Sequence, residues 1–226
     1  MEYFNDAWLI AVLQIIAIDI VLGGDNAIII ALACRNLPKH QRLAGILWGT
    51  AGAIILRVTL VFFATNLMEI PGLRLIGGIL LIWIGVKLLT EVETHDLDGK
   101  INQSSNLLTA IRTIIIADFI MSLDNALAIT AAAKGDIGLV VFGLLLSVPI
   151  IIWGSALILR LMERFPVIIT AGAGLLGWLG GGLMISDKIL AEFTATLPPA
   201  APTMATAIGA MFVVTIGRFL AKTKPE

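Results

Sequence analysis

Asp19-Ile20-Val21-Leu22-Gly23-Gly24-Asp25-Asn26-Ala27 is a motif that returns 99 residues later as Asp118-Phe119-Ile120-Met121-Ser122-Leu123-Asp124-Asn125-Ala126. Both copies read aspartate, five further residues, and then Asp-Asn-Ala. Each copy lies inside a run of Ile, Leu, Val and Ala that is long enough to cross a membrane, which needs about 20 apolar residues. Carboxylates inside a membrane are costly to place and mark functional sites by default. The duplicated motif therefore indicates both the fold and the site.

The composition of the whole chain is typical of a membrane protein. Of the 226 residues, 58% are hydrophobic and only 14% are charged, and the mean hydropathy is +0.99. Soluble domains have about 25% charged residues. The net charge of −1 argues against a nucleic-acid-binding surface. The single cysteine, Cys34, excludes an intrachain disulfide framework and a cysteine-based zinc cluster.

Seven membrane-spanning helices are expected, which gives an all-α, polytopic fold. Prolines, glycines and short charged turns separate the apolar runs. The expected spans are roughly 8–33, 43–66, 71–90, 108–132, 137–160, 166–186 and 204–220. A polar loop follows the third span, and Pro198, Pro199 and Pro202 predict a stiff, non-helical approach to the last span.

The distribution of lysine and arginine predicts the orientation of the chain. Cytoplasmic loops retain an excess of these residues. A topology with the N-terminus outside and the C-terminus in the cytoplasm places most of them on the inner side. The inner set is Arg35, Lys39, Arg42, Lys87, Lys100, Arg112, Arg160, Arg164, Arg218, Lys222 and Lys224, and the outer set is Arg74, Lys134 and Lys188.

The two motifs are three spans apart, so their helices are expected to cross the membrane in opposite directions. Residues 1–90 and 108–190 then form two inverted three-helix repeats. Residues 91–107 form a cytoplasmic polar loop between them, and residues 191–226 form an outer loop, the seventh helix and a cytoplasmic tail. Transporters built from inverted repeats bind their substrates near the midplane, where the repeats meet. The motif aspartates fall near the middle of their spans.

The spacing within each motif determines which side chains share a helix face. Asp19, Gly23 and Asn26 lie on one face, and the second copy repeats that spacing. Asp25 falls elsewhere, because six residues turn a regular helix by about 600°, or 120° short of two full turns. Convergence of all four motif carboxylates therefore favours a local unwinding, which Gly23 and Gly24 make easy in the first copy and which Ser122-Leu123 makes less obvious in the second.

The donor atoms of the motifs are suited to a hard metal ion. Carboxylate and amide oxygens are the ligands that Mg²⁺, Ca²⁺ and Mn²⁺ prefer, whereas Zn²⁺ and Cu⁺ favour the histidine and cysteine that both motifs lack. A divalent ion neutralises only two of four carboxylates, and protonation or a nearby cation must offset the others, which makes proton coupling a hypothesis. The predicted metal ligands are Asp19, Asp25, Asn26, Asp118, Asp124 and Asn125.

Arg57 is a basic residue in the middle of the second expected span. An unpaired arginine at that depth is unfavourable by roughly 3 kcal/mol on insertion scales. One hypothesis is that Arg57 pairs with a motif aspartate and holds the site when no metal is bound. The alternative is that it snorkels to the interface or pairs locally with Asn66 or Glu69.

The paired motif, with Gly23-Gly24-Asp25-Asn26-Ala27 in the first copy and Ser122-Leu123-Asp124-Asn125-Ala126 in the second, resembles the TerC family of integral membrane proteins. The resemblance extends over about residues 8–220. It implies an inverted-repeat membrane protein, and several members of the family are associated with manganese export from the cytosol. Carried over by position, the metal-handling residues are the four motif aspartates with Asn26 and Asn125.

The expected function is therefore transport of a divalent cation across the cell membrane. Mn²⁺ export by alternating access is the first expectation, with Ca²⁺ and Mg²⁺ as weaker alternatives. No phosphate-binding glycine-lysine motif is present, so gradients must drive transport and no enzymatic activity is expected. Two alternatives stay open: an accessory protein in membrane-protein insertion or in metal or tellurite resistance, and an intramembrane aspartyl protease. The sequence gives no indication of the oligomeric state.

Overall fold

The computed structural model describes residues 6–98, 106–133 and 136–223, and within these residues it contains only helices. The elements in chain order are α1 (Asp6–Arg35), α2 (Lys39–Met68), α3 (Leu73–Asp98), α4 (Leu107–Ala133), α5 (Ile137–Arg164), α6 (Val167–Ile185), the 3₁₀ turn η1 (Lys188–Leu190), α7 (Ala191–Ala195) and α8 (Ala201–Thr223). The all-α fold class expected from the sequence is confirmed. Each of the seven expected spans coincides with one of the long helices.

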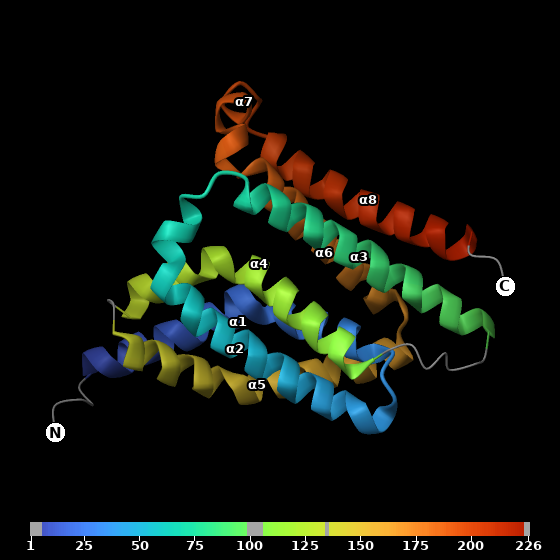
Figure 1. Cartoon of the computed structure of the whole chain (residues 1–226), viewed down its shortest axis with the longest axis horizontal. Helices are drawn as coiled ribbons and strands as arrows, with labels where there is room; N and C mark the ends of the chain where they lie inside the picture. The colour runs from blue at the N-terminus through green and yellow to red at the C-terminus, as the bar shows by residue number, and fades with distance from the viewer. Residues whose placement is uncertain (1–5, 99–105, 134–135, 224–226) are drawn as a thin grey trace.

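The long helices form two groups (Figure 1). The first group is α1, α2, α4 and α5, in which α1 packs on α5 and α4, and α2 packs on α4. The second group is α3, α6 and α8, which pack on one another. An apolar core that includes Ile29, Ala117, Leu81 and Leu176 joins the two groups. Both motifs therefore lie in the first group, whereas the glycine-rich helices lie in the second.

The second group is held by close approach of helix backbones. A Cβ atom added to Gly177 would clash with the carbonyl of Gly209, and one added to Gly78 would clash with the carbonyl of Gly180. Small residues at such crossings allow membrane helices to pack closely without a hydrophobic driving force. The glycine-rich third and sixth spans thus serve packing.

Five of the described helices, α2, α3, α5, α6 and α8, contain segments that are long and apolar enough to cross a membrane. A sixth span is obtained when the two halves of α1, Trp8–Ile20 and Gly24–Arg35, are counted as one. These halves meet at an angle of 46°. The break expected at Gly23 and Gly24 is therefore a bend in a helix that continues to Arg35. The expected count of seven spans is not confirmed by this measure.

Two helix boundaries differ from the sequence expectation. The third helix continues to Asp98, so the first part of the expected 91–107 loop is helical; residues 99–105 of that loop lie outside the described residues. The last helix begins at Ala201 and includes Pro202, which was expected to precede it. A proline in the first turn of a helix needs no intrahelical donor and its fixed φ suits the helix, so its position is compatible with a helix start.

A buried carboxylate ties the start of α3 to the chain that follows α6. Asp187, 2% exposed, follows α6 and accepts hydrogen bonds from the backbone N–H groups of Gly72 (2.9 Å), Leu75 (3.0 Å) and Ile189 (2.8 Å). Gly72 has φ of +86°, a conformation that glycine adopts without steric penalty. Burial raises the pKa of Asp187, but the donors of Ile189, Leu75 and Gly72 outweigh it and hold the pKa below its usual value.

Candidate metal-transport site

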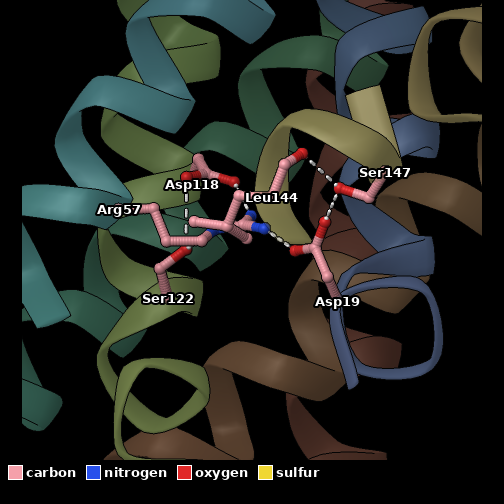
Figure 2. Close-up of polar contacts among 6 residues, drawn as sticks. All are labelled: Asp19, Arg57, Asp118, Ser122, Leu144 and Ser147. Atoms are coloured by element: carbon pink, nitrogen blue, oxygen red, sulfur yellow. Dashed lines mark hydrogen bonds and ion pairs between the residues drawn. The ribbon is translucent and has the colours of Figure 1, made fainter. Parts of the chain in front are cut away.

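Arg57 lies near the middle of α2 and is the centre of a buried polar cluster (Figure 2). Its guanidinium donates to Oδ1 of Asp19 on α1, to Oδ1 of Asp118 on α4 at 2.5 Å, and to Oγ of Ser122 at 3.0 Å. Arg57 and Asp19 are each 2% exposed, and Asp118 is 4% exposed. The first aspartates of the two motifs therefore meet on one arginine. The hypothesis that Arg57 pairs with a motif aspartate is confirmed, and the pairing includes both copies.

Two serines hold the remaining carboxylate oxygens of this cluster. Ser122, one turn after Asp118 on α4, donates to Oδ2 of Asp118 at 3.1 Å. Ser147 on α5 donates to Oδ2 of Asp19 and also lies 2.8 Å from the carbonyl of Leu144 (Figure 2). Both serines are buried. Every carboxylate oxygen of Asp19 and Asp118 thus has a hydrogen-bond donor, as buried charges require.

Ser122 was visible in the sequence as part of the repeated spacing, but Ser147 was not predicted. It is one of two serines in α5, the other being Ser155, and it lies two positions before Pro149 in the apolar part of the helix. A serine in a membrane helix usually bonds the carbonyl of the preceding turn, so its presence alone does not indicate a site. Its contact with Asp19 depends on the packing of α5 against α1, which the sequence does not specify.

The asparagine of the first motif lies close to Asp118. Asn26, 4% exposed, lines a small cavity of about 10 Å³ together with Asp118 and the apolar side chains Ile29, Ile30 and Ile114. Neither Oδ1 nor Nδ2 of Asn26 has a hydrogen-bond partner among the described residues. A volume of that size is at the lower limit for a single water molecule. Asn26 thus presents unsatisfied polar atoms to a space that is shared with a motif carboxylate.

Asp25, the second aspartate of the first motif, has no hydrogen bond or ion pair with Arg57 among the described contacts. Asp25 is half-buried, and its Oδ1 has no hydrogen-bond partner in the described part of the chain. Asn125 is buried, and the side chain of Asp124 lies outside the described residues. Among the described residues, no group of three or more His, Cys, Asp or Glu side chains is close enough to hold a metal ion. The convergence of four aspartates stays a prediction, and the structure brings together Asp19 and Asp118.

The electrostatics of the cluster explain why an arginine is tolerated at this depth. Two carboxylates and one guanidinium leave a formal charge of −1 in a site that excludes water. Burying unpaired charges costs several kcal/mol per ion, and close opposite charges with complete hydrogen bonding offset that cost. Because a guanidinium presents five N–H donors in a planar fork, it can bridge two carboxylates on different helices and also donate to Ser122. This arrangement joins α1, α2 and α4 at one point.

Comparison with known proteins agrees with the membrane character of the chain. It is 47% identical to the uncharacterized membrane protein YjbE of Bacillus subtilis (strain 168) over 189 residues, covering 83% of this chain and 85% of YjbE. It is 25% identical to membrane protein YkoY of the same organism, covering 80% of this chain and 59% of YkoY. It is 29% identical to the inner membrane protein YgdQ of Escherichia coli (strain K12), covering 71% and 73%.

No solved structure matches the chain at a significant level. Residues 4–225 match the sequence profile of the integral membrane protein TerC family. This match extends over nearly the whole chain and includes both motifs. The chain therefore belongs to the TerC family of integral membrane proteins and is a multi-pass membrane protein.

Proposed function

We propose that this protein is a secondary transporter of divalent cations, which exports Mn²⁺ from the cytosol by alternating access around the motif aspartates. The observation that carries the proposal is the meeting of Asp19 and Asp118 in the interior of the first helix group, both bound to the cationic group of Arg57. These two buried carboxylates come from different helices and already bind one cationic group, the guanidinium of Arg57. They could bind a metal cation in its place. Oxygen donors favour hard ions, which include Mn²⁺.

Asn26 supports the same proposal. Its unpartnered amide and the Asp118 carboxylate line one cavity, so an ion near Asp118 would also come close to a neutral oxygen donor. A buried amide without hydrogen-bond partners is unfavourable by about 1–3 kcal/mol. Such a group in a native structure calls for an explanation, and a role in binding an ion provides one. Asp25, Asp124 and Asn125 remain proposed ligands.

The packing pattern supports an inverted repeat. A Cβ atom added to Gly49 on α2 would lie 2.5 Å from Cδ1 of Ile114 on α4, and one added to Gly143 on α5 would lie 2.6 Å from Cγ2 of Ile15 on α1. Ile15 and Ile114 are 99 residues apart, as the motifs are. Gly49 and Gly143 are 94 residues apart, so only the isoleucine side of the contact keeps the 99-residue offset. The packing of α2 on α4 and of α5 on α1 is the pairing that a two-fold axis in the membrane plane would produce.

The two aspartates contact an arginine, which argues against the protease alternative. An intramembrane aspartyl protease needs two carboxyl groups that share a proton and activate water. Here Oδ1 of each aspartate accepts from Arg57, and Oδ2 accepts from a serine. The proposed orientation, with the N-terminus outside the cell membrane, follows from the distribution of lysine and arginine.

Transport in liposomes tests this function. Purified protein would be reconstituted into liposomes that contain calcein, a dye whose fluorescence is quenched by Mn²⁺. MnCl₂ would be added outside, and the loss of fluorescence would report Mn²⁺ entry. We expect saturable quenching for the wild type and a loss on the order of 10-fold for Asp118→Asn, because the substitution removes one charge from the site. Arg42→Gln, a change on the same helix as Arg57 but remote from the cluster, is the control. Equal rates for wild type and Asp118→Asn would overturn the proposal.

A further inference from the structure

We propose that Arg57 is a tethered counter-cation: its guanidinium and the transported divalent cation compete for Asp19 and Asp118, and Arg57 occupies the site whenever the carrier is empty. This inference rests on the proposed function and adds a mechanism to it. It assigns to Arg57 the step in which the empty carrier returns across the membrane. Two carboxylates without a counter-charge would oppose that step, because the site must be closed off from water while access changes from one side to the other.

The contacts of Arg57 show that its cationic group already fills the binding positions. All three guanidinium nitrogens are used: Nε by Ser122, and the two terminal nitrogens by Asp19 and Asp118 (Figure 2). A guanidinium keeps its proton at any physiological pH. It therefore cannot leave the site by losing its charge, and another cation can displace it only if the side chain moves.

The oxygen atoms used by Arg57 are separate from those used by the serines. Arg57 contacts Oδ1 of both aspartates, whereas Ser147 and Ser122 contact Oδ2 of Asp19 and Asp118 respectively. When the guanidinium leaves, one oxygen of each carboxylate becomes available while the other stays fixed. The two serines thus keep the carboxylates oriented for the incoming ion, which lowers the entropic cost of ordering them when the ion binds.

The charges make the two occupants mutually exclusive. With Arg57 in place the cluster has a formal charge of −1, and with a divalent ion alone it would be neutral. With both present it would be +1, with like charges sharing the same carboxylate oxygens at short range. Repulsion between like charges is strong in a site from which water is excluded. The two carboxylates therefore bind either Arg57 or the divalent ion, but not both at once.

The test compares two transport modes in proteoliposomes loaded with radioactive Mn²⁺. In exchange, unlabelled MnCl₂ is present outside and the carrier is loaded in both directions. In net efflux, no Mn²⁺ is present outside and the carrier must return empty. For Arg57→Gln we expect net efflux to fall on the order of 10-fold while exchange is retained, and the affinity for Mn²⁺ to rise by a similar factor. Arg42→Gln again serves as the control and should leave both modes unchanged.

A second variant keeps the test valid if Arg57→Gln does not fold. Arg57→Lys keeps the positive charge, but a single ammonium group cannot bridge two carboxylates and Ser122 in a planar fork. It should compete less well, and Mn²⁺ should bind more tightly than to the wild type, as measured by calorimetry with MnCl₂. Unchanged affinity in Arg57→Lys, or equal losses of exchange and net efflux in Arg57→Gln, would overturn the counter-cation role. A wild type without any Mn²⁺ exchange would instead overturn the proposed function itself.

Discussion

Removing the charge of Arg57 should destabilise the protein far more than removing the charge of Asp118. The side chains of Arg57, Asp19 and Asp118 are 3%, 1% and 5% exposed, so none of the three charges is relieved by solvent. Arg57→Gln leaves two buried carboxylates without a counter-charge, and removing one partner of a buried pair costs about 3–5 kcal/mol. Asp118→Asn instead leaves one carboxylate and one guanidinium, a balanced pair.

The asparagine in Asp118→Asn can still accept a hydrogen bond from Arg57 through its carbonyl oxygen. We therefore expect a loss of about 1 kcal/mol for this variant, the size of a typical hydrogen-bond change. For a chain of this length, 1 kcal/mol shifts the unfolding temperature by about 2–4 °C. The expected decreases are thus roughly 10 °C for Arg57→Gln and roughly 3 °C for Asp118→Asn.

Thermal unfolding in detergent micelles at neutral pH, with EDTA to remove divalent ions, measures both decreases. All variants must be heated at the same rate, because unfolding of membrane proteins is often irreversible. The triple variant Arg57→Gln/Asp19→Asn/Asp118→Asn should recover much of the loss, since it contains no buried charge at this position. If Asp118→Asn were as unstable as Arg57→Gln, the claim that uncompensated buried charge determines the loss of stability would be refuted.

Three further predictions concern other contacts, each measured by the same thermal unfolding. Asp187→Asn should lower the free energy of unfolding by about 2–3 kcal/mol near pH 7. Because the folded pKa of Asp187 is lowered, this difference should persist above the ordinary aspartate pKa of 3.8 and vanish as the pH falls through the folded pKa. Gly177→Ala should cost about 2 kcal/mol by separating α6 from α8 at Gly209, whereas Gly174→Ala, which has more room, should cost less. Ser147→Ala should cost about 1–2 kcal/mol, because Asp19 loses a donor.

The sequence was sufficient to predict the helices and to single out the aspartates of the buried polar cluster. Long apolar runs predicted the long helices, since a membrane leaves few other ways to satisfy the backbone. Asp19 and Asp118 were identified because carboxylates are rare in such runs. The pairing of Arg57 could be anticipated for the same reason, although the sequence could not show that one guanidinium reaches both motifs.

Other features depended on packing that the sequence does not encode locally. The contact of Ser147 with Asp19 joins positions 128 residues apart. The division of the helices into two groups depends on backbone contacts such as that between Gly177 and Gly209, and glycines alone do not indicate their partners. The helical continuation to Asp98 was missed because charged residues replace the apolar pattern there.

Anomalous diffraction from crystals grown with MnCl₂ tests the central claim most directly, because it locates the ion itself. We predict one Mn²⁺ peak between the carboxylates of Asp19 and Asp118, with the guanidinium of Arg57 moved away from Oδ1 of both residues. A bound Mn²⁺ elsewhere in the chain, with Arg57 still on both aspartates, would contradict the account.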